Sequence, residues 1–547
     1  MKIDNFKKST LLITYLLSAA IMISVIQSCV KDNFEFNKLT KTEWNPNIAV
    51  PLVYSSLTIQ DILNRSNQQN QIIVGSDNFC TLIYRGNLFS LSASDLIQIP
   101  NQQPPSYSAP LSPAQIAVLS SIGTVTASYS QTVNFVSGTN SPEIDSVIFK
   151  TGNISISLNS DFRFSGQIVI KIPAAKKNGV VFSKTLLLAY SGSVPVIATA
   201  NYDLAGYTFD MTNGGTIYNQ FAINYDITLT GSGTPPLTTN EITFNQSLSD
   251  MKFDKLFGDI GQLALSPDKD TVALSIFRNA FGTGNFTLVN PKIKIVISNS
   301  YGVPIAANIS QFDGYKPKTG NYSITGSPNP LPIYSPNFSQ IGQNLTGSFT
   351  LDNSNSNIVS VINNIPEYVI YKINSQTNPS GATHNNFVID SSHFKVDMEI
   401  EMPLWGTAKN FSLIDTADFK MDQTIIDDIE SGLFRVYNSN GFPIDIEMQI
   451  YFTDSIYNKL DSLMLPNQLI LQSAIVNLST GIVISPTQKT YDVVFTKTKL
   501  ENLKRSKHIL IKAVANTTNG GNTNVKFYSD YKLDVKLGVQ IQIKKKI

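Results

Sequence analysis

An internal repeat constrains the fold of this chain more than any other feature of its sequence. The segment NSYGVPI at residues 299–305 recurs as NSNGFPI at residues 438–444. Each copy follows a stretch in which apolar and polar residues alternate, and such alternation predicts a strand with one buried face. Asn, Gly and Pro between two such stretches predict a turn. The sequence therefore predicts the same strand–turn–strand element twice.

The repeat extends well beyond this turn. Residues 368–373 (YVIYKI) match residues 509–514 (ILIKAV), and FKVD at 394–397 matches YKLD at 531–534. A degenerate third copy, without the Gly-x-Pro, is predicted at 154–160. Several markers at nearly constant spacing indicate a duplicated structural unit of about 140 residues, as expected for repeat architectures.

The two turns make one prediction about backbone conformation. Gly302 and Gly441 occupy equivalent places between alternating strands, where a tight turn commonly needs a positive φ. Pro304 and Pro443 then fix φ as the chain leaves the turn. We therefore expect both glycines to be required for their conformational freedom.

The predicted fold class is mainly β, with tandem β-sandwich-like domains and a few short helices. Most segments are rich in β-branched and aromatic residues and are bounded by Gly, Pro, Asn and Ser. The helices are too few and too short to cover a parallel sheet. They are predicted at 57–64, 113–120, 251–257, 358–362, 424–429, 456–463 and 500–505.

The length of 547 residues exceeds what one hydrophobic core usually organises. The predicted segments are a signal peptide at 1–28, a tether at 29–45, an N-terminal module at 46–140, and β-units at 141–270, 271–400 and 401–547. Charged residues make up only 15% of the chain and the net charge is +1, so nothing indicates nucleic acid as a partner.

The N-terminus indicates export and lipidation. Three lysines within the first eight residues precede an uncharged run at 11–26, which is shorter than the ~20 residues that span a bilayer. Ser28 and Cys29 follow, and the whole resembles a bacterial lipoprotein signal. The resemblance implies that Cys29 is cleaved free and acylated, so that a membrane is the partner of the N-terminus. An uncleaved anchor and an ordinary secreted protein are the alternatives.

Lys31 and Asp32 come directly behind Cys29. A lysine followed by an acidic residue at this place resembles the surface-export signal of Bacteroidetes-type lipoproteins. The resemblance implies anchoring in the cell outer membrane with the protein exposed at the surface; the alternative faces the periplasm.

The repeated strand and turn also resemble a known domain type. Asn290-Pro291, an alternating strand, the Asn299 turn and Pro304 are similar to domains of the late embryogenesis abundant type. These domains are small β-sandwiches, so the resemblance implies that architecture for each copy.

Signatures of catalysis are missing from the sequence. The three histidines, His384, His393 and His508, stand in separate segments, and no His-Glu-x-x-His, P-loop or Gly-x-Ser-x-Gly motif is present. We predict no catalytic residue, no metal ligand and no cofactor. The densest acidic stretch, Asp415 to Glu430, leaves open glycoside hydrolysis by paired carboxylates.

Five Asp-Ser/Thr-aliphatic tripeptides resemble the O-glycosylation sequon of exported Bacteroidetes-type proteins. Their hydroxyl residues are Ser146, Thr271, Thr416, Ser455 and Ser462. The resemblance implies modification at one or more of them, while Asp-Thr and Asp-Ser are equally good turn chemistry.

The remaining chemistry-bearing residues have structural interpretations. Cys80 has no partner once Cys29 is lipidated, and is expected to be a small buried hydrophobe. Trp44 and Trp405 each lie near a Pro-Leu pair at the start of a predicted module. This position favours packing between modules over a platform for sugars.

These features predict a non-enzymatic cell-envelope lipoprotein, a lipid-anchored β scaffold or binding protein for adhesion, protein partners or glycans. Carriage of a lipid or another hydrophobic ligand is the first alternative, because tandem alternating strands can line an apolar groove. A carbohydrate-active enzyme that uses acidic residues is the second.

Overall fold

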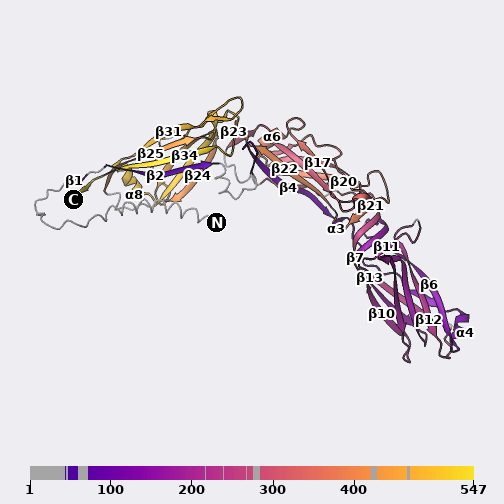
Figure 1. The fold of residues 1–547 in the computed structure, drawn as a ribbon. Helices are drawn as coiled ribbons and strands as arrows, with labels where there is room; N and C mark the ends of the chain where they lie inside the picture. The colour runs from indigo at the N-terminus through magenta and orange to yellow at the C-terminus, as the bar shows by residue number, and fades with distance from the viewer. Residues whose placement is uncertain are drawn as a thin grey trace, which may run out of the picture. The chain divides into compact units, whose positions relative to one another are not determined.

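The computed structural model describes residues 43–44, 47–58, 72–138, 140–215, 217–237, 239–265, 268–274, 284–419, 428–464 and 468–546. Antiparallel sheets dominate these residues, and helices are few and short, which confirms the predicted fold class (Figure 1). The chain forms two compact units. The first contains residues 1–84, 275–291 and 401–547, and the second contains 85–274 and 292–400. No helix among the described residues is long and apolar enough to cross a membrane.

The copy of the repeat that contains Gly302 forms two sheets, mainly in the second unit. The first has the order β14-β20-β17-β18, and the second β19-β16-β22-β4, with the short β3 (Ile72–Val74) beyond β4. Their bounds are β14 Asp270–Ala273, β20 Tyr368–Thr377, β17 Ile305–Lys316, β18 Gly320–Ser323, β19 Leu345–Leu351, β16 Lys292–Asn299, β22 His393–Pro403 and β4 Cys80–Ser92.

The other copy, in the first unit, repeats this arrangement strand for strand. Its sheets have the orders β24-β32-β26-β27, with β28 also on β26, and β31-β25-β34-β2. The bounds are β24 Phe411–Asp418, β32 His508–Thr517, β26 Ile444–Thr453, β27 Lys459–Ser462, β28 Leu469–Leu471, β31 Thr487–Phe495, β25 Ile429–Asn440, β34 Lys532–Ile543 and β2 Asn47–Thr58. The shared strand order confirms the duplication.

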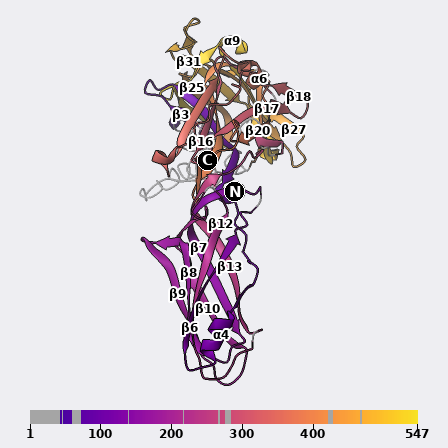
Figure 2. The same cartoon turned by 90° about the vertical axis from the view of Figure 1, so that its right-hand side faces the viewer.

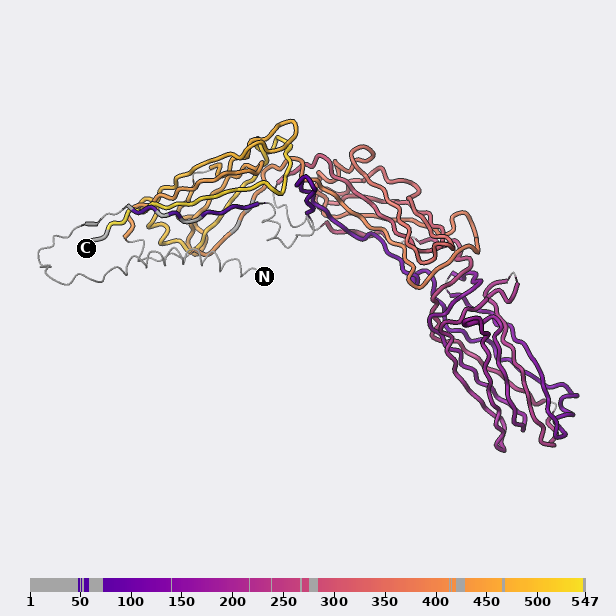
Figure 3. The backbone as a smooth tube through the Cα atoms, viewed as in Figure 1, coloured from indigo at the N-terminus to yellow at the C-terminus, as the bar shows by residue number. Residues whose placement is uncertain are grey.

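Strands that are distant in sequence complete these sheets. Indigo β2 lies beside yellow β34 in Figure 3, and the two pair antiparallel from Asn47 to Thr58. The residues of the predicted N-terminal module at 46–140 are thereby distributed over three sheets. β2 and β4 each belong to a sheet of one repeat, and β5 and β6 belong to a ten-stranded sheet outside both repeats. Pairing over such sequence distances leaves no local pattern from which a boundary could be predicted.

A further sheet, outside the two copies of the repeat, has ten strands and belongs to the second unit (Figure 2). Its strands are β5 Tyr107–Pro110, β6 Thr124–Asn134, β7 Glu143–Ser160, β8 Ser165–Lys177, β9 Val180–Leu188, β10 Val196–Asp203, β11 Thr208–Asp210, β12 Gln220–Thr230, β13 Glu241–Asp259 and β21 Asn386–Ile389. Alternate residues are buried along the longer strands; Ile154, Ile156 and Leu158 on β7 are at most 2% exposed. This period of two fills the core on one face of each strand.

Smaller elements complete the described chain. The strands are β1 Glu43–Trp44, β15 Asn285–Leu288, β23 Trp405–Lys409, β29 Ile475–Val476, β30 Val483–Ser485, β33 Val525–Lys526 and β35 Lys545–Lys546. The helices are α3 Ala93–Leu96, α4 Pro113–Leu119, α6 Ile358–Asn363, α8 Lys497–Arg505 and α9 Thr518–Gly521, with the 3-10 turn η4 Phe338–Gln340.

Three of the predicted helices are confirmed, as α4, α6 and α8. The helix predicted at 251–257 is wrong, because these residues continue β13 through several register shifts against β7 that disturb the alternation. The helix predicted at 456–463 is also wrong, since a turn leads there into β27. The helices predicted at 57–64 and 424–429 lie largely outside the described residues, and the ends that are described belong to β2 and β25.

A buried asparagine holds the corner between the two sheets in each copy. Asn299 accepts the Tyr301 N–H at 3.0 Å and donates to the Tyr334 carbonyl at 3.1 Å. Asn440 accepts the Phe442 N–H at 2.9 Å and donates to the Gln472 carbonyl at 2.8 Å. The structural equivalent of Asn299 is therefore Asn440 and not Asn438, because the corner of the second copy is shorter by two residues.

Gly302 and Gly441 are required for a reason other than the predicted one. Neither has a positive φ, so the expectation about backbone freedom is wrong. A Cβ on Gly302 would overlap the ring of Phe387, which is fully buried, and a Cβ on Gly441 would lie 2.7 Å from the Lys532 carbonyl oxygen. Both glycines allow close approach of a neighbouring segment.

We therefore expect Gly302→Ala and Gly441→Ala to destabilise the protein by about 1–3 kcal/mol each, the usual cost of overpacking. Each change should lower the thermal transition of its own compact unit, as measured by calorimetry, because distant sites act independently. Gly432→Ala in β25 is the control, since its Cβ would meet no atom closer than 3.8 Å. Equal shifts from all three variants would contradict the close-approach explanation.

Candidate functional site

The predicted lipidation and export residues are not described by the structure. Cys29, Lys31 and Asp32 all precede Glu43, the first described residue. Their roles stay predictions from the sequence.

The five hydroxyl residues of the predicted sequons belong to several elements, and Ser455 and Ser462 share the hairpin formed by β26 and β27. Thr271 on β14, Thr416 on β24 and Ser455 in a turn are exposed, whereas Ser146 on β7 and Ser462 on β27 are half-buried. Three of the neighbouring aspartates accept local backbone N–H groups: Asp454 accepts those of Ile456 and Asn458 at 3.0 and 2.9 Å, and Asp270 and Asp461 each accept the N–H of the next residue at 2.7 Å. Exposure thus favours Thr271, Thr416 and Ser455 as acceptors, and modification stays a prediction for all five.

Each histidine has a polar partner from a distant part of the chain. His384 lies between two carboxylates of β7, with Nδ1 2.9 Å from Asp145 Oδ1 and Nε2 3.3 Å from Glu143 Oε2. His508 pairs with Asp418 at 3.0 Å and its ring stacks on Tyr457. His393 Nδ1 lies 3.3 Å from Ser300 Oγ. These contacts join neighbouring strands and loops, and no spacing in the sequence could have indicated them.

The acidic stretch proposed for glycoside hydrolysis falls mostly outside the described residues. Of its members, Asp418 pairs with His508 and the carbonyl of Asp428 accepts the Lys544 N–H at 2.8 Å. Among the described residues, no group of three or more His, Cys, Asp or Glu side chains is arranged to hold a metal ion.

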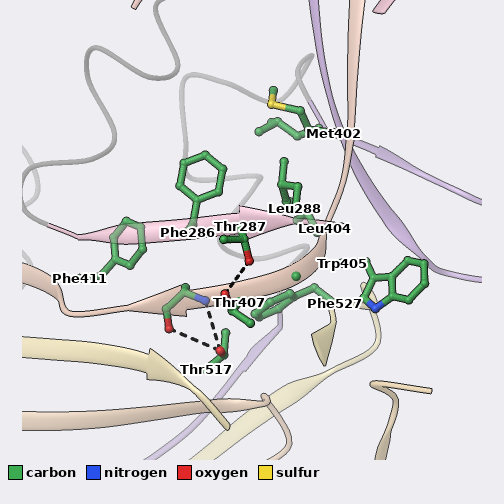
Figure 4. A pocket seen from close by; sticks show the side chains of 13 residues that line it. Phe286, Thr287, Leu288, Met402, Leu404, Trp405, Thr407, Phe411, Thr517 and Phe527 are labelled. Atoms are coloured by element: carbon green, nitrogen blue, oxygen red, sulfur yellow. Dashed lines mark hydrogen bonds between the residues drawn. The ribbon is translucent and has the colours of Figure 1, made fainter. Parts of the chain in front are cut away.

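An apolar pocket of about 150 Å³ lies in the first compact unit (Figure 4). Phe286 and Leu288 of β15 line it together with Phe411 and Phe527. The threonine hydroxyls that line it form hydrogen bonds with other lining residues: Thr287 Oγ1 and Thr407 Oγ1 lie 2.7 Å apart, and Thr517 Oγ1 accepts the Ala408 N–H at 3.2 Å. The described lining residues therefore present hydrocarbon and offer no charge to a ligand.

A second hollow of about 230 Å³ continues from this pocket. The two share Ala408, Phe411, Thr517 and Phe527 as lining residues. No local sequence signal links these residues as a group, because they come from four strands or loops. The alternating segment NFTL at 285–288 was the one local signal of an apolar face.

Trp405 borders the pocket and is covered by a cation. Lys526 Nζ lies 4.6 Å from the centre of its ring, on the neighbouring strand β33. The side chain of Trp44 is outside the described residues. The predicted packing of both tryptophans between modules stays a prediction.

Cys80 is fully buried at the start of β4, and burial, with a smaller contribution from Asp530, raises the pKa of its thiol to about 11. A thiol with this pKa stays protonated at pH 8, and only the thiolate reacts rapidly with alkylating agents.

We therefore expect the native protein to resist iodoacetamide at pH 8 and to react once unfolded in denaturant, where the pKa returns to about 8.5. Mass spectrometry after timed labelling measures both rates. Labelling of native protein as fast as that of unfolded protein would contradict the burial of Cys80.

Comparisons with known proteins identify no family for this chain. No family model matches it, and no curated protein matches its sequence. A crystal structure of a protein from Parabacteroides distasonis ATCC 8503, described as secreted, is similar over 91% of this chain and 99% of its own, with 10% identity and a TM-score of 0.24. A TM-score this low supports no conclusion about fold or function.

Proposed function

We propose that this protein is a non-enzymatic lipoprotein of the cell envelope, anchored through Cys29, whose β domains serve as a scaffold or binding surface. One observation carries the proposal: an uncharged run of 16 residues, preceded by lysines and followed by Ser28-Cys29. Such a run is too short to span a bilayer as a helix. Several acyl chains on one cysteine hold a protein at a membrane far more firmly than a single chain.

The contacts that the polar side chains make support the role of a scaffold. Histidine, the usual acid–base catalyst near neutral pH, is here paired with carboxylates or a hydroxyl from other segments. The buried asparagines Asn299 and Asn440 satisfy backbone groups at the sheet corners. These groups fix the geometry of the domains, which is the requirement for a structural protein.

We place the protein at the outer membrane, with its domains exposed at the cell surface. Lys31 and Asp32 support this orientation through their resemblance to a surface-export signal. If the protein were not exported to the surface, it would be anchored in the same membrane but would face the periplasm.

Carriage of a hydrophobic ligand is the second candidate, and the apolar pocket beside Phe286 favours it. At about 150 Å³, the pocket is smaller than the ~300 Å³ at which ligand pockets usually begin, although the adjoining hollow extends it. Detection by native mass spectrometry of acyl chains bound to the purified protein would favour carriage of a hydrophobic ligand over the scaffold function.

The anchor is tested with Cys29→Ser. The variant should lose acylation and leave the membrane fraction, because a serine hydroxyl does not replace the thiol in lipidation. Cys80→Ala is the matched control, since it removes the other cysteine and should stay membrane-bound. Metabolic labelling with a fatty acid and cell fractionation measure both properties. A Cys29→Ser protein that stays in the membrane uncleaved would show that residues 11–26 are an anchor.

The orientation is tested with protease added to intact cells. The wild-type protein should be degraded, and a variant with Lys31→Ala and Asp32→Ala should be protected, because it stays inside. Immunoblots of treated and lysed cells give the result. Equal protection of both proteins would place the wild type in the periplasm.

A further inference from the structure

A third hollow, of about 720 Å³, lies on the sheet β31-β25-β34-β2 of the first compact unit. Its lining residues are Pro51, Tyr54, Arg435, Tyr437, Lys536, Leu537 and Gly538. The volume lies within the range of ordinary ligand sites. In contrast to the pocket beside Phe286, it is walled by charged groups as well as by aromatic rings.

Strand register brings these side chains together. Lys536 on β34 lies opposite Tyr54 on β2 and Tyr437 on β25, and its ammonium is 5.4 and 5.7 Å from the centres of the two rings. Two residues further along the same face, Gly538 lies opposite Pro51 and Arg435. The glycine contributes no side chain, so the sheet is hollowed at this point.

A β-bulge makes the arrangement possible. The register of β2 shifts by one residue between Pro51 and Val53. Without this shift, Pro51 and Tyr54 would lie on opposite faces of the strand, because they are an odd number of residues apart. Bulges are known to redirect side chains in this way at binding sites.

The charged groups around the hollow are oriented and ionised. Arg435 binds Asp492 of β31 through two hydrogen bonds, Nε to Oδ1 at 2.7 Å and Nη2 to Oδ2 at 2.6 Å. This contact lowers the pKa of Asp492. Within the described part of the chain, two of the five N–H donors of the guanidinium are thus used, and three remain. Two cations and one carboxylate leave a net charge of +1 at the hollow.

The ammonium of Lys536 supplies the uncompensated charge. Two carboxylates on the same face of the sheet, those of Asp492 and Asp534, are paired with Arg435 and Lys532. Among the described residues, Lys536 has contacts with the two tyrosine rings and with no carboxylate. An anionic group entering the hollow would therefore gain a charged hydrogen bond that the free protein lacks.

We propose that this hollow binds an acidic saccharide, a pyranose that carries a carboxylate. The C–H faces of a pyranose pack on aromatic rings, which Tyr54 and Tyr437 provide on two sides. Lys536 and the free N–H groups of Arg435 bind the carboxylate, and Asp492 accepts hydrogen bonds from hydroxyl groups. The inference rests on the proposed role of the chain as a binding protein and assigns its ligand class.

The test is calorimetric titration of the purified mature chain with oligomers of galacturonic and of glucuronic acid, and with their methyl esters. The esters keep the shape of the sugar and remove its charge. We expect the acids to bind and the esters to bind at least about tenfold more weakly, the loss expected for one charged hydrogen bond. Absence of binding by both acids at millimolar concentration, or equal binding of acids and esters, would overturn the proposal.

Variants locate the site. Lys536→Gln should weaken binding of the acids about tenfold, and Gly538→Val should abolish it by filling the hollow, in a strand that valine favours. Tyr54→Ala provides a further test that is independent of folding, because Tyr54 is 68% exposed. Lys459→Gln is the matched control: Lys459 lies 4.0 Å from the Tyr451 ring on the other sheet, and its loss should leave binding unchanged.

Unchanged binding in Lys536→Gln and Tyr54→Ala would overturn this location of the site. The outcome is distinguishable from failure of the proposed function, because acylation and fractionation of Cys29→Ser do not depend on any ligand. A chain that is anchored but binds no acidic sugar would remain a scaffold with another ligand.

Discussion

The duplicated sandwich depends on satisfying backbone polar groups where a strand leaves its sheet. At such a corner the ladder of hydrogen bonds ends, and a buried N–H or carbonyl without a partner costs about as much as a lost hydrogen bond. Asn299 and Asn440 meet this requirement with one side chain, which accepts from the backbone two residues ahead and donates to a loop more than 30 residues away. A threonine performs a similar task at the end of the partner strand. Thr377 accepts the Leu263 N–H at 2.7 Å, and Thr517 accepts the Ala408 N–H at 3.2 Å.

The sequence pattern predicts the fold class because burial in an antiparallel sheet has a period of two. Residues 292–299 alternate without interruption between buried and partly exposed, and the strand is found where the pattern places it. The pattern fails where the ladder is irregular. Residues 251–257 lie in β13 beside register shifts, so that their apolar residues no longer alternate and suggest a helix. Pairing between distant strands, such as β2 with β34, leaves no local trace at all.

The same contrast applies to single residues. The Gly-x-Pro repeat correctly marks a structural constraint at Gly302 and Gly441, but its cause is a neighbouring segment that is invisible in the sequence. Cys80 is buried as its apolar neighbours predict. The aromatic and charged side chains around Gly538 come from four strands separated by up to about 490 residues, and their assembly depends on a bulge. Local chemistry can therefore suggest which residues matter, while the site they form follows from the register of the sheet.

The pairing of β2 with β34 also determines how the first unit carries mechanical load. A pull on the chain before Asn47 acts along the axis of β2, whose ladder with β34 extends over eleven residue pairs. When the opposing force acts at the far end of the ladder, beside Thr58 and Lys532, the hydrogen bonds are sheared together; when it acts at the C-terminal end of β34, beside Asn47, they open one after another. A force applied at Asn47 is thus distributed over the full length of the β2–β34 ladder when the unit is held at the end beside Lys532.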